Sequence, residues 1–314
     1  MSSNCLPLFA VPSMWVTPLW MVAVGLLIGV AVLMALGAIA RLVAPKVAAI
    51  ARITAKEAMS QPLFYVLLAI GVFGIILFPF ISYNTLGEDI KMLKEEGLTL
   101  IMVLSIIMAL WTASMSISEE IEGRTALTLL SKPVGRRQFI FGKFLGILVP
   151  VAIIFLVLGA LFLASVSFKV VYDVRETSNP DPTLADCQAE MLQIAPGLLL
   201  SFMETVVLTA ISVAISTRLP MLANLIICAA IYVLGHLVPS LAESALGQIE
   251  FVRFVANLSA AVLPVLDAFN ISAGISTGQH VPAAYLGWAA LYCVLYSSVA
   301  MLLALLLFED RDLA

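Results

Sequence analysis

Long runs of apolar residues, separated by short polar segments, make up most of the chain. Each run is close to the roughly twenty residues that a helix needs to cross a bilayer. The pattern predicts seven spans, at residues 18–43, 62–83, 98–117, 144–168, 196–217, 221–238 and 283–308. It therefore predicts an all-α polytopic membrane protein with six core transmembrane helices and one extra N-terminal transmembrane helix. We expect the extra helix in residues 1–45 and the transmembrane domain in residues 46–314.

The first connecting segments are polar and differ in character. Residues 47–60 have polar positions at helical spacing and lie between Pro45 and Pro62, which predicts a short helix along the membrane surface. Residues 84–97 and 169–193 carry several charges and few long apolar runs. We expect both of these segments to be loops on the outer side.

The segment before the last span is harder to assign. Residues 239–282 contain two apolar pieces, at 249–255 and 258–269, that are too short to cross a bilayer. They predict re-entrant or surface helices on the outer side, since irregular backbone is tolerated only where protein or water covers it. Residues 218–220, by contrast, predict a tight turn on the inner side.

The distribution of lysine and arginine predicts the orientation, because cytoplasmic segments carry an excess of positive charge. With the N-terminus outside, most of the basic residues are cytoplasmic, and these are Arg41, Lys46, Arg52, Lys56, Arg124, Lys132, Arg136, Arg137, Lys143, Arg218 and Arg311. The outer segments hold Lys91, Lys94, Lys169, Arg175 and Arg253. We therefore expect a multi-pass protein of a bacterial cytoplasmic (inner) membrane with a cytoplasmic C-terminus.

Composition narrows the partners and the chemistry. Hydrophobic residues make up 62% of the 314 residues, charged residues make up 11%, and the mean hydropathy is +1.10, whereas soluble domains carry about 25% charge. The net charge of −4 gives no sign of nucleic-acid binding. Gly142-Lys143 is followed by Phe144, so the phosphate-binding loop pattern is absent. We expect a non-catalytic chain in a lipid bilayer, with no cofactor and no nucleic acid.

The most highly charged stretch runs from residue 116 to residue 146, between the third and fourth predicted spans. Glutamates come first and basic residues follow, with apolar residues between them: Glu119, Glu120, Glu122, Arg124, Lys132, Arg136, Arg137 and Lys143. The stretch is therefore predicted to be a cytoplasmic hairpin. One interpretation is a solvated loop whose basic residues only fix the topology. The other is a docking element for a soluble partner.

The fifth predicted span contains the one acid that lies well inside a span, Glu204. Hydroxyl residues follow the same helix at steps of three or four: Ser201, Thr205, Thr209, Ser212 and Ser216. An intramembrane acid is costly and is a functional hypothesis by default. The alternative is a glutamate that is hydrogen-bonded to neighbouring hydroxyls and holds helices together. Our candidates for a translocation path are Ser201, Glu204, Thr205 and Ser212, and a weaker stripe contains Ser105, Thr112 and Ser116.

The charged stretch resembles the permease subunits of ABC transporters of the type-2 exporter superfamily, in particular those of the copper-enzyme-maturation and gliding-motility kind. The matching residues are Glu120, Glu122, Gly123, Thr125, Leu129, Pro133, Arg136, Gly142, Lys143 and Gly146, with Arg124 inserted after the glycine. Weaker similarity covers the end of the chain, at Leu263-Pro264, Phe269, Tyr285, Tyr292, Tyr296, Phe308 and Arg311-Asp312-Leu313. The similarity extends over about residues 49–313. The extra N-terminal span departs from the six spans that are usual in such permeases.

The resemblance implies a function and partners. Residues 47–60 would be the elbow helix, and residues 119–138 would hold a coupling helix that docks into a separate ATP-binding subunit. Two permease chains would pair, as a homodimer or with a second permease, in an ATP-driven exporter. The resemblance assigns coupling to Glu119, Glu120, Glu122, Thr125, Pro133, Arg136, Arg137 and Lys143.

Three alternatives stay open. A proton-coupled secondary transporter would use Glu204 as its proton carrier, although the sequence offers no second acid or base inside the spans and no inverted repeat. A membrane enzyme would use His236, His280 and outer carboxylates, but no ligand motif joins the two histidines. A non-transporting chain would only anchor an ATPase in the membrane.

Overall fold

The computed structural model describes residues 15–81, 89–118, 135–177, 183–243, 250, 254, 263–271, 274 and 281–309. Within these residues the chain is helical throughout and forms no strand. Six helices are long and apolar enough to cross a membrane: Leu19–Val43, Pro62–Phe80, Asp89–Ile117, Arg136–Asp173, Leu184–Ser216 and Ala283–Glu309. The predicted all-α polytopic fold is therefore confirmed.

Each predicted span corresponds to a helix, although α5, α8 and α9 extend beyond the predicted bounds. They are α2 (Leu19–Val43), α3 (Pro45–Ser60), α4 (Pro62–Leu77) with η1 (Phe78–Phe80), α5 (Asp89–Ala113) with η2 (Ser114–Ser118), α8 (Arg136–Thr177), α9 (Leu184–Ser216), α10 (Met221–Glu243), η4 (Leu266–Phe269) and α13 (Ala283–Glu309). The predicted span at residues 221–238 corresponds to α10, whose apolar part, Met221–Leu237, is shorter than the six spans. The tight turn at residues 218–220 is present between α9 and α10.

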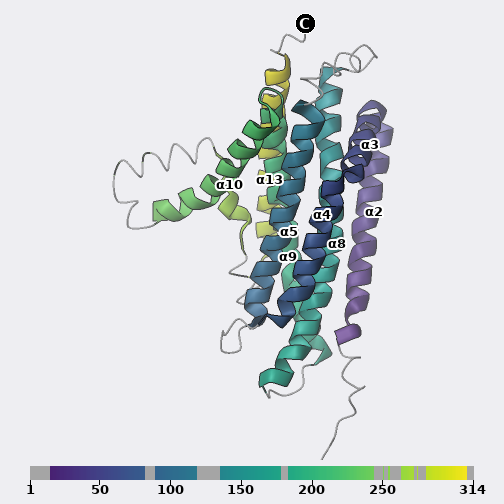
Figure 1. The fold of residues 1–314 in the computed structure, drawn as a ribbon, viewed down its shortest axis with the longest axis vertical. Helices are drawn as coiled ribbons and strands as arrows, with labels where there is room; N and C mark the ends of the chain where they lie inside the picture. Colours follow the sequence, from purple (N-terminus) through teal and green to yellow (C-terminus); the bar gives the residue numbers. More distant parts are fainter. Residues whose placement is uncertain are drawn as a thin grey trace, which may run out of the picture.

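Helix α8 is the centre of the bundle. It contacts α2, α3, α4, α5, α9 and α13. These long helices lie side by side along the vertical axis of Figure 1, with α2 at one edge, while α10 leaves the bundle at an angle. We call the end where α5 ends and α8 begins the hairpin end, because residues 119–134 connect the two helices there. The C-termini of α9 and α13 also lie at this end.

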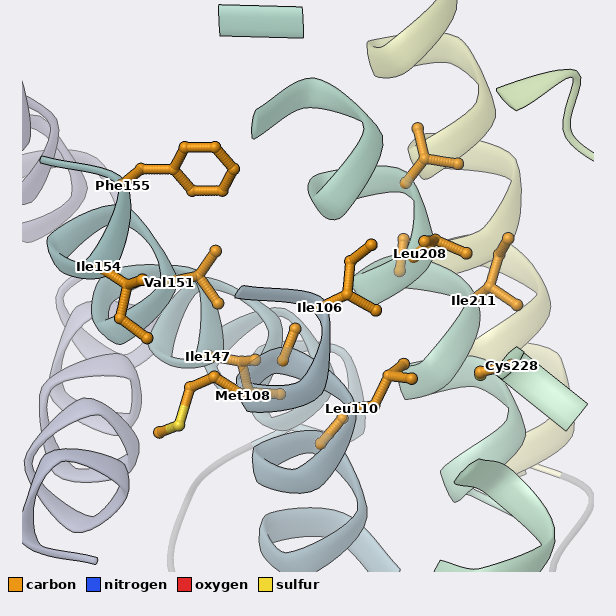
Figure 2. Close-up of a cluster of buried hydrophobic side chains, with 14 of the residues drawn as sticks. Ile106, Met108, Leu110, Ile147, Val151, Ile154, Phe155, Leu208, Ile211 and Cys228 are labelled. Atoms are coloured by element: carbon orange, nitrogen blue, oxygen red, sulfur yellow. The ribbon is translucent and has the colours of Figure 1, made fainter. Parts of the chain in front are cut away.

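The apolar core is formed by buried side chains of α4, α5, α8, α9 and α13, with Cys228 from α10. Figure 2 shows part of this core, with Ile106, Met108, Leu110, Ile147, Val151, Ile154, Phe155, Leu208, Ile211 and Cys228 labelled. In lipid, such helices gain little from excluding water and associate mainly through close packing and interhelical hydrogen bonds. Tight side-chain packing here therefore fixes how α5 and α9 sit against α8.

Two glycines of α8 let the short helix α3 approach it closely. A Cβ added at Gly142 would lie 2.7 Å from the Cβ of Ile50, and one added at Gly146 would lie 2.8 Å from the carbonyl oxygen of Ala51. The spacing of four residues places both glycines on one face of α8, as in the small-xxx-small pairs of membrane helices. A helix is present at the predicted residues 47–60, within α3, and it is anchored to the first part of α8. That it lies along the membrane surface stays a prediction.

Helix α2 is the most peripheral span. None of its residues is buried in the described structure. A Cβ at Gly29 would clash with the Leu156 side chain of α8, whereas nothing lies within 4 Å of a Cβ at Gly25 or Gly37. The helix therefore touches the bundle at few points and adds little to its core.

The expectation of an outer loop at residues 84–97 is wrong from Asp89 onward, because α5 begins there. The charges of this segment are accommodated by pairing across helices. Lys94 is only 2% exposed, forms an ion pair with Glu190 of α9 and donates a hydrogen bond to the Gln193 side chain at 2.8 Å. A buried lysine that is paired in this way does not interrupt a helix.

The expectation of an outer loop at residues 169–193 is wrong at both of its ends. Helix α8 continues to Thr177, and α9 already begins at Leu184. Lys169 is buried in α8, with its Nζ 3.0 Å from Asp173 Oδ1 and 3.5 Å from Asp89 Oδ2 of α5. The charged residues that led to the prediction of a loop instead form ion pairs at the ends of α5, α8 and α9.

Helix α9 has a defined start. Thr183 Oγ1 accepts a hydrogen bond from the Asp186 N–H, and Asp186 Oδ2 accepts one from the Thr183 N–H at 2.9 Å. This capping box satisfies two backbone donors of the first turn. The predicted re-entrant helices at residues 249–255 and 258–269 lie mostly outside the described residues, where the 3₁₀ helix η4 is the described regular element near them.

Candidate functional site

Three of the predicted coupling residues, Arg136, Arg137 and Lys143, lie at the hairpin end. The others fall outside the described residues: Glu119, Glu120, Glu122, Thr125 and Pro133. The helices that flank them are described. Helix α5 changes into a π-helix at Ser114–Ser118 just before this segment. Single turns of π-helix are rare and occur frequently at functional sites.

The basic residues at the start of α8 have three different environments. Arg137 is exposed. Arg136 Nη1 donates a hydrogen bond to the Glu309 carbonyl oxygen at 3.0 Å, and its guanidinium lies 5.9 Å from the centre of the Phe308 ring. Lys143 is 3% exposed, with its Nζ 5.7 Å from the centre of the Phe139 ring. Arg136 and Arg137 are therefore both exposed to a partner, whereas Lys143 is buried.

Arg136 connects the start of α8 to the end of α13. Helices leave their last carbonyl groups without a partner inside the helix, and an arginine is a common donor to them. The Phe139 and Phe308 rings stack beside this contact, with centroids 5.8 Å apart. The last span is therefore attached to the helix that leaves the charged hairpin.

The polar stripe predicted on α9 is buried along its whole length, at Ser201, Glu204, Thr205, Thr209, Ser212 and Ser216. Two of its hydroxyls are satisfied within the helix. Thr205 Oγ1 donates to the Ser201 carbonyl at 2.9 Å, and Thr209 Oγ1 donates to the Thr205 carbonyl at 2.6 Å. Such back-bonding removes the need for another partner, so the two threonines differ from the rest of the stripe.

The hairpin-end half of the stripe converges on one amide, Asn224 of α10. Its Nδ2 lies 2.7 Å from Ser114 Oγ, 2.8 Å from Ser212 Oγ and 2.9 Å from Ser216 Oγ. The Cys228 thiol contacts Asn224 Oδ1 at 3.3 Å. We call these residues the Asn224 cluster. It links the π-helical end of α5 with α9 and α10, within the fully buried part of the bundle.

The other half of the stripe faces a cavity. A space of about 140 Å³ lies between α5, α9, α10 and the segment around η4. Its lining includes Ser201 and Glu204 from the stripe, and also Leu98, Thr99, Met102, Gly197, Tyr232, His236, Phe269, Asn270 and Ile271. Glu204 is 1% exposed, whereas Thr99 and Asn270 are exposed. The carboxylate thus lies deep in the cavity and the two polar residues lie near its rim.

His236 is the residue that faces Glu204 inside this cavity. Its Nε2 lies 3.4 Å from Glu204 Oε1, and its Nδ1 lies 3.1 Å from the Tyr232 carbonyl oxygen. A carbonyl oxygen can only accept, so this contact assigns the Nδ1 as the donor. The Nε2 is then the ring nitrogen available to the acid. Glu204 therefore does have an ionisable neighbour, contrary to the expectation from sequence that no second acid or base accompanies it.

The second predicted stripe is also buried. Ser105, Thr112 and Ser116 of α5 and η2 are at most 5% exposed, and their hydroxyl oxygens have no hydrogen-bond partner among the described residues. Buried hydroxyls without partners cost free energy. They are therefore places where a water molecule or a bound group would gain hydrogen bonds.

Sequence reasoning found the α9 stripe but missed its partners. Asn224 follows the turn at residues 218–220 as a single amide in an apolar helix, and an intramembrane amide of this kind is a signal that could have singled it out. His236 belongs to no ligand motif in the sequence, and its proximity to Glu204 depends on how α10 crosses α9. His280 lies outside the described residues.

The bundle and its buried polar residues define a multi-pass membrane protein with an intramembrane polar site. The sequence model of the family described as ABC-2 family transporter protein matches residues 25–313. The chain belongs to this family and is a membrane permease of an ABC transporter. The match begins inside α2 and covers all the later helices. No curated protein matches the chain.

Membership of this family also indicates the general roles of the permease and of its partner. ABC-2 permeases are transmembrane components, generally without catalytic activity, and typically pair with an ATP-binding subunit. Among the described residues, no group of three or more His, Cys, Asp or Glu side chains could hold a metal ion.

Proposed function

We propose that this chain is the permease subunit of an ATP-driven exporter, and that it docks a separate ATP-binding subunit through residues 119–138. The observation that supports this most directly is the set of contacts at both ends of the hairpin. On one side, Ser114 of the π-helix belongs to the Asn224 cluster. On the other side, Arg136 and Phe139 contact the end of α13. A displacement of the hairpin would therefore reach α5, α9, α10 and α13 together.

The coupling role fits some of the basic residues better than others. Arg137 is exposed and suits a charged contact with a partner, because rim charges steer association. Arg136 already binds the end of α13, and Lys143 is buried beside Phe139. We assign Arg137 and the glutamates of residues 119–122 to docking, and Arg136 and Lys143 to transmission of the movement into the bundle.

A photo-crosslinking experiment tests the docking surface. A photoreactive amino acid would replace Arg137, and in a second variant Glu122, in the native membrane. We expect each to form an adduct with a protein whose sequence contains the nucleotide-binding loop pattern G-x-x-x-x-G-K-[ST]. The matched control is the same photoreactive residue at Tyr65, an exposed position on α4. Adducts with such an ATPase at Tyr65 only, or at none of these positions, would contradict the proposal.

We further propose that two permease chains pair around the transport path, as a homodimer or with a second permease, in a bacterial cytoplasmic membrane. The polar residues would then line the path from the cavity at Glu204 toward the Asn224 cluster. Ser201, Glu204 and Ser212 face these two sites, while the Thr205 hydroxyl is bonded within α9. Thr205 is accordingly the weakest of the four path candidates.

A proton-coupled transporter is the second candidate function, and one observation favours it. Glu204 and His236 approach to 3.4 Å inside the bundle, and such acid–histidine pairs occur in proton relays. This mechanism requires transport that follows a proton gradient and continues when the ATPase is inactivated. The ATP-driven mechanism requires transport to stop under the same condition, so one transport assay separates the two.

A further inference from the structure

We propose that the cavity beside Glu204 binds an organic ammonium group, with the Glu204 carboxylate as its counter-ion. That the bound molecule is the transported one rests on the proposed function; the binding itself does not. The occupant would be a compact cationic group with a short apolar attachment, such as the primary ammonium end of a larger molecule. Nothing in the ABC-2 family match specifies this chemistry.

The first argument is the charge that is aimed into the cavity. Glu204 is 1% exposed, and its Oε1 accepts no hydrogen bond from any described residue. A carboxyl group in these surroundings gains a great deal from an opposite charge, because little water is present to solvate it. The nearest ionisable group is His236 at 3.4 Å, and this distance is too long for a strong charge-assisted hydrogen bond.

The second argument is the charge balance around the cavity. Among the described residues that line it, none is a lysine or an arginine. Asp267 of η4 is exposed and acts electrostatically on Glu204, which makes the surroundings more negative. Among the described residues, an anionic molecule would meet the buried acid, with a second acid acting on it, and no lysine or arginine. A cation would be attracted to the deepest point of the cavity.

The third argument is the size and the apolar part of the lining. The volume of about 140 Å³ is close to that of the engineered cavity of about 150 Å³ that binds benzene in another protein. The cavity therefore has room for roughly as many heavy atoms as a benzene molecule contains. Leu98, Met102, Phe269 and Ile271 supply apolar surface, and Tyr232 supplies an aromatic ring. Aromatic rings and apolar walls bind organic cations well, since the cation contacts the ring face.

A bound metal ion fits these observations less well. The cavity offers one carboxylate and one imidazole, and the described residues contain no group of three or more metal-ligating side chains. Catalytic and structural metal sites commonly use three or four protein ligands. An ammonium group needs only acceptors, and the Glu204 carboxylate with the hydroxyls of Ser201 and Thr99 provides them.

Protection from chemical modification tests the proposal with the full-length chain in lipid nanodiscs and no ATPase present. Dicyclohexylcarbodiimide, an apolar reagent, modifies carboxyl groups in apolar surroundings. Mass spectrometry quantifies the loss of the unmodified Glu204 peptide, so that the N-acylurea and any butylamide formed from the activated carboxyl both count as labelling. The probe is n-butylammonium, and the control is 1-butanol, which has the same length and no charge. We expect butylammonium at ten times its dissociation constant to slow labelling of Glu204 about tenfold, since the free fraction falls as 1/(1 + [L]/Kd). Butanol should leave the rate unchanged.

Variants separate the cavity from the rest of the helix. Ser201→Ala should weaken the protection, because one acceptor in the cavity is lost. Thr209→Val is the matched control on the same helix, since this hydroxyl is bonded to the Thr205 carbonyl and does not line the cavity. It should leave the protection intact. Glu204→Gln should remove the labelled peptide and so identify the site of reaction.

Three outcomes would overturn the inference: equal protection by butanol, no protection at any butylammonium concentration that leaves the chain folded, or protection by Zn²⁺ but not by butylammonium. These outcomes leave the docking proposal untouched, because the experiment contains no ATPase. Conversely, loss of the crosslink to an ATPase at Arg137 would refute docking without affecting the binding measured here. The two failures are therefore distinguishable.

Discussion

At the scale of single residues, Asn224 is the side chain on which the most interhelical hydrogen bonds depend. Its amide nitrogen reaches the hydroxyls of Ser114, Ser212 and Ser216. An Nδ2 group has two hydrogens, so it can satisfy two of these oxygens at once, and the third contact is electrostatic. The cluster thus holds α5, α9 and α10 in one arrangement while remaining able to exchange partners. Such a cluster suits a contact between helices that must be stable and must also be able to rearrange.

Asn224→Leu keeps a side chain of similar shape and should destabilise the bundle. Interhelical hydrogen bonds in membranes contribute about 0.6 kcal/mol on average and at most about 1.7 kcal/mol each, so the loss of two should lower the free energy of unfolding by about 1–3 kcal/mol. Thermal unfolding in detergent measures this. Leu222→Ala, at an exposed position of the same helix, is the control and should have a smaller effect. An unchanged unfolding temperature for Asn224→Leu would refute the role given to the cluster.

Lys94 allows a second test at this scale. Lys94→Met removes a buried cation and leaves Glu190 and Gln193 without its donors. Breaking a buried pair costs about 3–5 kcal/mol, and because Glu190 is 31% exposed, water reduces the cost to the lower end or below. The double variant with Glu190→Gln should recover part of the loss in a double-mutant cycle of unfolding measurements. Strict additivity of the two single changes would show that the pair is not coupled.

At the scale of helices, the contact between α3 and α8 depends on two small residues. Gly146→Leu places a side chain where the Ala51 carbonyl and the Thr54 side chain already lie. Overpacking of this kind costs about 1–3 kcal/mol, and here it should push α3 away from α8. The measurements are thermal unfolding and the rate of proteolysis within α3. Gly37→Leu is the matched control, because nothing lies within 4 Å of a Cβ there. Equal effects at both glycines would contradict the packing argument.

The helices themselves could be predicted from the sequence because hydrophobicity and length are local properties. The start of α4 at Pro62 and the end of α2 at Val43 agree with the predicted spans. The failures occurred where a charged segment finds its partner far along the chain. Lys94 pairs with Glu190, and Lys169 with Asp89. Local patterning treats such charges as solvent-exposed, so it predicts helices that are too short.

The candidate site shows the same division between local and long-range information. The buried stripe of α9 follows from the spacing of its hydroxyls and acid. The approach of His236 to Glu204 and the cavity between them arise from the crossing of α9 and α10, which periodicity does not specify. The coupling residues of the hairpin came from a family resemblance, and most of them lie outside the described residues.

At the scale of the whole molecule, the two ends of the bundle differ in how their charges are used. Arg41, Arg137 and Arg218 lie at the hairpin end and are exposed. At the opposite end, Lys94 and Lys169 are buried in ion pairs with acids. Positive charge that is neutralised by a neighbouring acid contributes less to orientation than positive charge that faces the cytoplasm. Discounting the paired lysines therefore increases the excess of positive charge at the hairpin end. This excess is the basis of the predicted orientation, in which the hairpin end faces the cytoplasm.

Cysteine accessibility tests this orientation. Lys91→Cys marks the end opposite the hairpin, and Arg137→Cys and Arg218→Cys mark the hairpin end. A membrane-impermeant maleimide should label the cysteine at position 91 in intact spheroplasts, and those at positions 137 and 218 only in inverted vesicles. Of the four native cysteines, Cys187, Cys228 and Cys293 are buried. Cys5 is replaced by serine in every variant, and labelling of this Cys5→Ser chain sets the background. The reverse pattern would place the charged hairpin on the side of the membrane away from ATP and would refute docking. Labelling of positions 137 and 218 from opposite sides would refute the bundle itself, because the start of α8 and the end of α9 both lie at the hairpin end.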